Sequence, residues 1–199
     1  EYMSKNVCAS KKIQGDLQMK NLLLIGDSIR MGYDKSVKKT LEGKANVMNA
    51  AWGGIYDHGK IYISLSNHKT TDNLKIKNAF TVGFATKDTE VISDYFGVVS
   101  GRDQDKIEKS GVHVIKSNFV DAPIIEEYPL TLECTVESFE DGDLIGKIVN
   151  CSVDEKYIDE NGKIDVDKME IITYDMTSNT YRVLGPVVGK AFKDGFDLK

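Results

Sequence analysis

Residues 46–75 read NVMNAAWGGIYDHGKIYISLSNHKTTDNLK, and this stretch combines two different local patterns. Its first half is poor in side-chain bulk, because Ala50 and Ala51 precede Trp52 and two glycines follow it. A strand of this kind lets a planar ligand approach the backbone and bond with its N–H and C=O groups. A single tryptophan more often lies in a core, so the prediction of a ligand-contacting strand depends on the small residues around Trp52.

The second half of the stretch predicts a strand that leads into a helix. Apolar and polar residues alternate from 61 to 66, which is the period of a half-buried strand. N-cap residue types follow at 70–72. The inner face of the helix is expected to carry Leu74, Ile76, Ala79 and Phe80. Free N–H groups at such a start, beside Lys69 and two threonine hydroxyls, suit a phosphate; an ordinary capped helix with one exposed lysine is the alternative.

Several segments of the chain resemble the flavin reductase-like family of FMN-binding split barrels, and within it the flavoredoxin branch. They are NVMNAAWGGIYD (46–57), IYISLSNHKTTDNLK (61–75), AFTVGFAT (79–86), SDYFGVVSG (93–101), FVDAPIIEEYPLTLEC (119–134) and YRVLGPVVGKAF (181–192). These segments follow one another in the order that the family shows.

The resemblance implies a mainly β fold, a six-stranded antiparallel Greek-key barrel with short helices, and a homodimer with FMN near the subunit interface. It implies no catalytic side chain, because the flavin carries the chemistry. The cofactor-binding residues that it implies are Asn46, Asn49, Ala50, Ala51 and Trp52 beside the ring, Ser64, Ser66, His68, Lys69, Thr70 and Thr71 beside the phosphate, and Asp94, Ser100 and Arg102 in a covering loop. His68 is equally well an exposed loop residue.

The implied reaction passes electrons from NAD(P)H through FMN to a flavin, a metal complex, a disulfide or a partner protein. The chain has no GxGxxG motif, so NAD(P)H is expected to bind transiently over the flavin rather than in a Rossmann domain. Arg102, Lys106 and Lys109 either attract a dinucleotide phosphate or form a solvated helix face, and we favour the solvated face. An FMN-binding electron carrier or flavin-storage protein without turnover of its own is the alternative function.

Composition excludes several other classes of protein. A net charge of −5 argues against nucleic acid as a partner, and it means that an anionic cofactor needs local positive groups such as Lys69. The chain has no apolar run long enough to cross a membrane and no signal-peptide pattern. Cys8, Cys134 and Cys151 lack metal or redox spacing and are expected to be buried reduced thiols. We therefore expect a soluble cytoplasmic protein without a metal site.

The remaining sequence alternates between strand and helix patterns. The expected elements are a strand at 80–86, helices at 90–99 and 103–110, a hairpin at 129–153 that turns at 140–143, a polar turn at 159–163, a helical turn near 167–169 and a strand at 170–174. Gly111 is expected to end the second helix. Nothing repeats, and no linker divides the chain after residue 46, so this part is expected to form one domain.

Residues 1–45 fit the resemblance less well, so we divide the chain into an atypical N-terminal segment (1–45) and a flavin reductase-like domain (46–199). A possible first barrel strand lies at 22–26, and a longer insert with a basic helical stretch follows at 28–44. The N-terminal segment either completes the barrel in a different way or derives from an unrelated sequence. A degenerate barrel that has lost its flavin is therefore a further alternative.

The segment MKNLLLIGDSIRMGYD (19–34) resembles the first block of the SGNH (GDSL-type) esterases, in which Ser28 would be the nucleophile. Such a serine needs a histidine base and an oxyanion hole. None of the three histidines follows an aspartate at the spacing of that family, and the chain has no Asn-Asp dipeptide. An esterase is therefore the least expected function.

Overall fold

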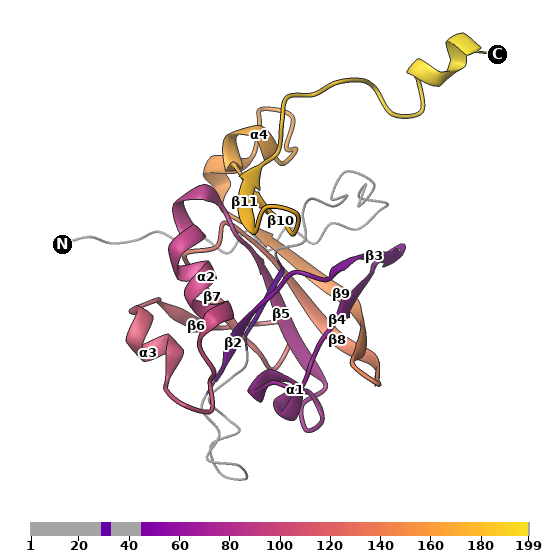
Figure 1. Ribbon diagram of the computed structural model, residues 1–199. Helices are drawn as coiled ribbons and strands as arrows, with labels where there is room; N and C mark the ends of the chain where they lie inside the picture. Colours follow the sequence, from indigo (N-terminus) through magenta and orange to yellow (C-terminus); the bar gives the residue numbers. More distant parts are fainter. Residues whose placement is uncertain (1–28, 33–44, 199) are drawn as a thin grey trace.

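A computed structural model describes residues 29–32 and 45–198 of the chain (Figure 1). The strands are β1 (Ile29–Gly32), β2 (Val47–Ala50), β3 (Gly53–Asp57), β4 (Lys60–Ser64), β5 (Ala79–Phe84), β6 (Val114–Lys116), β7 (Pro123–Ile125), β8 (Leu130–Glu140), β9 (Asp143–Val153), β10 (Ile172–Asp175) and β11 (Thr180–Val183). The helices are α1 (Lys69–Leu74), α2 (Glu90–Val98), α3 (Lys106–Ser110) and α4 (Val166–Met169). Short 3-10 turns lie at Lys87–Thr89, Glu155–Tyr157 and Asp194–Leu198. Among the described helices, none has the length and apolar character of a membrane span.

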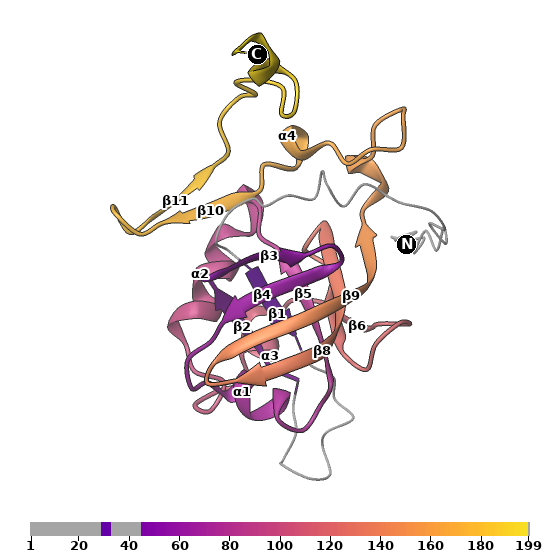
Figure 2. The same ribbon diagram turned by 90° about the vertical axis from the view of Figure 1, so that its right-hand side faces the viewer.

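Seven strands form one antiparallel sheet in the order β2-β1-β5-β8-β9-β4-β3 (Figure 2). The strands at its two ends, β2 and β3, are consecutive in the chain and separated only by Ala51 and Trp52. Pairing reaches into this gap, because the N–H of Ser64 donates to the C=O of Trp52 at 2.8 Å. β2 and β3 are therefore one bent strand that closes the sheet, and the mainly β, six-stranded antiparallel Greek-key barrel is confirmed.

Alternate residues of the barrel strands fill its interior, as the two-residue period of a strand requires. The largest fully buried side chains there include Ile63, Phe80 and Leu144. Gly146 of β9 makes room for Phe80, because a Cβ at position 146 would overlap the end of that ring. Cys134 is buried in the same core, and burial raises the pKa of its thiol.

The connection from β4 to β5 crosses one end of the barrel, because these strands lie on opposite sides of the closed sheet. It contains α1, which has only six residues and places Leu74 in the core. The prediction of a longer helix with Ile76, Ala79 and Phe80 on its inner face is wrong: Ile76 is exposed, and the other two belong to β5. A short apolar run fits a helix and a strand equally well, so periodicity alone cannot separate the two.

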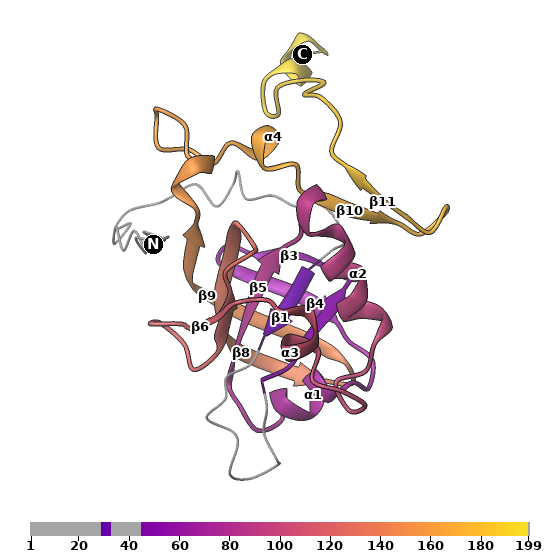
Figure 3. The same ribbon diagram turned by 90° about the vertical axis from the view of Figure 1, so that its left-hand side faces the viewer.

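A second layer covers the outer face of β2 (Figure 3). Met48 points into the barrel and Val47 points outward, where it packs with Phe96 of α2 and Tyr128. The predicted helices at 90–99 and 103–110 are present as α2 and α3, and α3 ends at Gly111 with φ +72°. The hairpin at 129–153 is also present, as β8 and β9.

The strand between β2 and β5 in the sheet is β1, Ile29–Gly32. These residues fall within the predicted insert at 28–44, so this part of the insert is a barrel strand. The expected strand at 22–26, the basic stretch at 34–44, Ser28 and Cys8 lie outside the described residues. The domain boundary between residues 45 and 46 stays a prediction.

Candidate functional site

A small cavity lies where β2, the start of α1 and the chain between α2 and α3 meet. Its lining includes five of the predicted site residues, Asn46, Asn49, His68, Lys69 and Ser100. The other lining residues are Met48, Phe96, Gly97, Val99, Gly101 and Lys106. The cavity volume is about 30 Å³, which is room for about two or three water-sized groups. It can therefore accept one end of a ligand but not a planar ring system.

Asn46 is fixed at this cavity from two sides. Its Nδ2 donates to Thr70 Oγ1 at 2.7 Å, and both residues are buried. Gly101 lies against the other side of the same amide, because a Cβ at position 101 would overlap Asn46 Oδ1 and lie 2.7 Å from Asn46 Cγ. A single side chain thus connects β2, α1 and the loop after α2.

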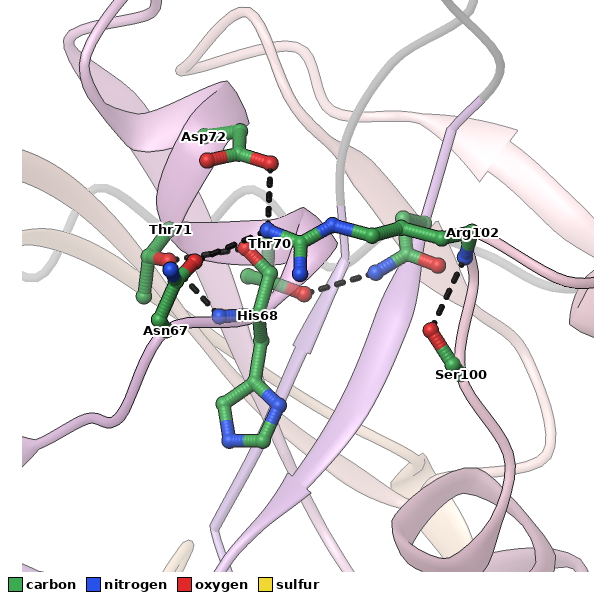
Figure 4. Close-up of polar contacts among 8 residues, drawn as sticks. Asn67, His68, Thr70, Thr71, Asp72, Ser100 and Arg102 are labelled. Carbon is green, nitrogen blue, oxygen red and sulfur yellow. Dashed lines mark hydrogen bonds and ion pairs between the residues drawn. The ribbon is translucent and has the colours of Figure 1, made fainter.

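The two threonines predicted to contact a phosphate lie in the first turn of α1 (Figure 4). Thr70 is 0% exposed, and its hydroxyl accepts the bond from Asn46. Thr71 Oγ1 accepts the N–H of His68 at 3.0 Å and donates to the C=O of the same residue at 2.8 Å. The N-cap is therefore His68 rather than one of residues 70–72. A direct phosphate contact by either hydroxyl stays a prediction.

Arg102 ties the loop after α2 to α1 (Figure 4). Its Nη2 donates to Asn67 Oδ1 and to Asp72 Oδ2, each at 2.8 Å, and its backbone N–H donates to Ser100 Oγ at 3.1 Å. The bond from Arg102 lowers the pKa of the Asp72 carboxyl. Because the pair is solvent-exposed, it positions the loop more than it stabilises the fold.

Positive charge gathers at the cavity. Lys106 is only 4% exposed, and its Nζ donates to the C=O of Phe96 at 2.8 Å. The predicted position of Lys106 on a solvated helix face is therefore wrong. Burial, followed by the charges of Lys106 and Arg102, lowers the pKa of His68 and thus disfavours its charged form. In a chain with a net charge of −5, lysines at this cavity favour an anionic group.

The other predicted site residues do not line the cavity. They are Ala50, Ala51, Trp52, Ser64, Ser66, Thr70, Thr71, Asp94 and Arg102. Ala50 is packed in the barrel core. Trp52 lies at the bend between β2 and β3 with 58% of its surface exposed, so it is not a core residue. Within the residues that the structure describes, no group of three or more metal-ligating side chains comes together.

Tyr181, which the sequence did not single out as a site residue, connects the hairpin of β10 and β11 to the cavity. Its hydroxyl donates to Asp94 Oδ1 at 2.8 Å and accepts from Asn49 Nδ2 at 3.2 Å. The polarity is fixed, because an ionised carboxylate only accepts and a hydroxyl has a single proton. Asn49 Oδ1 then lies buried without a hydrogen-bond partner among the described residues. A buried acceptor of this kind suits a ligand N–H or a water.

Residues 57–169 match the family described as flavin reductase like domain. Among solved structures, flavoredoxin of Desulfovibrio vulgaris (Miyazaki F) is 28% identical, with a TM-score of 0.78 over 87% of this chain and 94% of that chain. Flavoredoxin from Methanosarcina acetivorans is 27% identical, with a TM-score of 0.75 over 96% of this chain and 100% of that chain.

An FMN-binding domain of a flavin reductase-like enzyme from Shewanella baltica is 17% identical, with a TM-score of 0.71 over 83% of this chain and 89% of that chain. At this identity the likeness supports the fold alone. A comparison with curated proteins finds no match. The family match spans more than half of the sequence, and the barrel agrees with it. This chain therefore belongs to the flavin reductase-like domain family.

Proposed function

We propose that this chain binds FMN and acts as a flavin reductase-like or flavoredoxin-like oxidoreductase, which takes electrons from NAD(P)H and passes them to a flavin or another acceptor. The observation that carries the proposal is the cavity at which Lys69, the buried Lys106 and the fixed amide of Asn46 meet. This is an anion-binding arrangement in a member of a flavin-associated family.

The size of the cavity decides which end of FMN enters it. A volume of about 30 Å³ suits the oxygens of a phosphate group and is far too small for the isoalloxazine ring. The ring would then lie outside, along the small residues Ala51 and Gly53 and beside Trp52. Because α1 has only six residues, its dipole contributes little, and the two lysines supply most of the attraction for the phosphate.

The protein's own residues bind and orient the cofactor. Lys69, Lys106 and Asn46 would hold the phosphate end, and Asn49 Oδ1 offers an acceptor to a ribityl O–H next to it. Bound FMN supplies the hydride and electron chemistry. The open surface beside Trp52 leaves one face of a ring accessible for a transient nicotinamide. We further propose a homodimer with a cytoplasmic location.

The first experiment is the absorption spectrum of the purified protein before and after addition of FMN, with excess flavin removed by gel filtration. We expect about one flavin per chain to be retained, with chromatography identifying it as FMN. NAD(P)H oxidation by the reconstituted protein then separates an oxidoreductase from a flavin carrier. A protein that stays colourless after reconstitution would contradict FMN binding and would favour the alternative of a barrel that has lost its flavin.

Replacing Lys69 with alanine is expected to lower FMN affinity about tenfold, because one charge-assisted contact to the phosphate is lost. Riboflavin affinity should change much less, since riboflavin has no phosphate. Fluorescence titration with both flavins measures the difference. Lys75→Ala, an exposed lysine at the other end of α1, is the matched control. Equal losses for FMN and riboflavin would contradict the phosphate assignment.

Replacing Tyr181 with phenylalanine is expected to weaken FMN binding by about three- to tenfold, because Asn49 loses the bond that fixes its amide. Tyr174→Phe is the matched control. The rings of Tyr174 and Tyr181 form a tilted pair in the same hairpin, but the Tyr174 hydroxyl donates to Asn179 Oδ1 at 2.6 Å. Titration of both variants with FMN gives the comparison. Equal effects of the two changes would mean that the hairpin acts only through its own stability.

A further inference from the structure

Residues 184–198, which we call the C-terminal arm, carry large apolar side chains into solvent. Val188 is 99% exposed, Phe192 92% and Leu198 93%. In all three views the arm leaves β11 and runs away from the barrel (Figures 1 to 3). A folded chain rarely leaves so many neighbouring apolar groups uncovered, so such a segment marks an interaction surface.

The arm also has a defined structure of its own. The N–H of Lys190 donates to Asp194 Oδ2 at 2.7 Å, and the C=O of Lys190 accepts from the N–H of Asp194 at 3.2 Å. Phe192 lies inside this turn with φ +61°, a left-handed conformation that is unfavourable for a phenylalanine. The turn thus holds an aromatic side chain outward at a cost in free energy, and backbone strain of this kind typically accompanies a functional contact.

The barrel carries a matching surface at the bend between β2 and β3. Trp52, Ile55 and Tyr56, which we call the β3 patch, are all exposed. Within the described sheet β3 pairs with β4, and its exposed apolar side chains form a surface open to association. The patch begins directly after Ala51 and includes Trp52, so it continues the surface along which we place the flavin ring.

We propose that the C-terminal arm of one copy packs on the β3 patch of a second copy and brings its Phe192 next to Trp52 of the partner subunit. The arm points away from its own barrel, so a partner subunit is the occupant that its direction favours. A two-fold axis places each arm on the patch of the other copy. Both arms and both patches are then covered, so the assembly closes as a dimer and does not grow into a longer chain of copies. Each arm would then border the flavin surface of the other subunit.

Charge also favours a second copy as the occupant. Two copies with a net charge of −5 repel each other, so a contact surface that adds no further negative charge is favoured. Within the arm, Lys190 and Lys193 balance Asp194 and Asp197. The arm therefore brings apolar area to an acidic partner without adding net negative charge. This inference rests on the homodimer proposed above and names the segment that forms it.

The first test compares the solution mass of the full chain with that of the V188D/F192D variant by light scattering at matched concentrations. We expect a two-chain mass for the natural sequence and a one-chain mass for the variant, with the circular dichroism spectrum of the barrel unchanged. I115D is the control, because Ile115 is an exposed apolar residue on β6, and it should keep the two-chain mass. A two-chain mass for V188D/F192D would overturn the proposal.

The second test locates the arm with a photo-crosslinking phenylalanine analogue at position 192, in an equal mixture of unlabelled and ¹⁵N-labelled copies. Crosslinked peptides that contain Trp52 and combine both isotopes would place the arm on the partner subunit. Crosslinks within single copies, or to other surfaces, would overturn the proposal while leaving a homodimer in place. A one-chain mass for the natural sequence would instead remove the homodimer itself, and flavin content is measured independently of both.

Discussion

Replacing Gly101 with alanine is expected to lower FMN affinity by about 10- to 100-fold. The added methyl group would overlap Asn46 Oδ1 and lie 2.7 Å from Asn46 Cγ. Asn46 is buried and bonded to Thr70 at 2.7 Å, so it can move only by breaking that bond. The change therefore disturbs the polar anchor of the cavity without removing any polar group. Titration with FMN, together with a thermal unfolding curve, measures both consequences.

Two controls test whether the loss of FMN affinity comes from the contact between residue 101 and Asn46. Gly162→Ala, in the exposed turn at 159–163, places a methyl group where no atom lies within 4 Å, so it should leave FMN affinity unchanged, although its φ of +75° costs some stability. In an Asn46→Ala background the obstructing amide is already gone, and adding Gly101→Ala should cost little more. Such non-additivity is the signature of two residues in direct contact. Fully additive losses would mean that Gly101 acts through the loop backbone and not through Asn46.

The parts of the fold that the sequence predicted are those specified by local chemistry. The turn at 140–143 places Asp141 at φ +50° and Gly142 at φ +94°, and an Asp-Gly pair is suited to such a two-residue hairpin. The helix stop at Gly111 has the same kind of origin, since its φ of +72° favours glycine. These features depend on a few neighbouring residues, so a single sequence is enough to locate them.

The parts that the sequence missed depend on contacts between distant residues. The length of α1 is set by the point at which the chain must cross the barrel and join β5. The apolar periodicity of the sequence does not indicate this point. The burial of Lys106 depends on the packing of α3 near Phe96. The sequence does not show this contact, because a lysine with charged neighbours in the chain is typical of a solvated helix face. The role of Tyr181 arises because it meets Asn49, which lies 132 positions away in the chain. Five predicted residues still line the cavity, because they lie in or next to segments that resemble the family along their whole length.

A buried carboxylate on the outside of the barrel leads to the second large effect. Glu133 of β8 is 1% exposed. Its Oε1 accepts from Asn150 Nδ2 and Ser152 Oγ, each at 2.6 Å, and its Oε2 accepts from Ser117 Oγ. Ser117 Oγ in turn accepts the N–H groups of residues 119 and 120, each at 2.9 Å. Glu133 thus joins two positions of β9 to the loop between β6 and β7.

Replacing Glu133 with alanine is expected to lower the free energy of unfolding by about 3–5 kcal/mol, because several charge-assisted bonds are lost and one of their donors, Ser117, is buried. The midpoint of thermal unfolding should fall by about 10 °C. Glu137→Ala, on the same strand, is the matched control. Its partly exposed carboxylate pairs with Lys60 at 2.5 Å, and its loss should cost far less than the loss of Glu133, because solvent screens an exposed pair.

Urea and thermal unfolding, followed by circular dichroism, compare the two glutamate variants. The loop should also open in Glu133→Ala, since Ser117 loses the acceptor that orients it toward the N–H groups of Phe119 and Val120. Hydrogen exchange at those two amides is then expected to accelerate well before the barrel unfolds, whereas in Glu137→Ala it should stay at the rate of the natural sequence. Equal stability losses in the two variants would mean that the packing of Val120 and Ala122 on Ala79 of β5 holds this loop in place without help from the carboxylate.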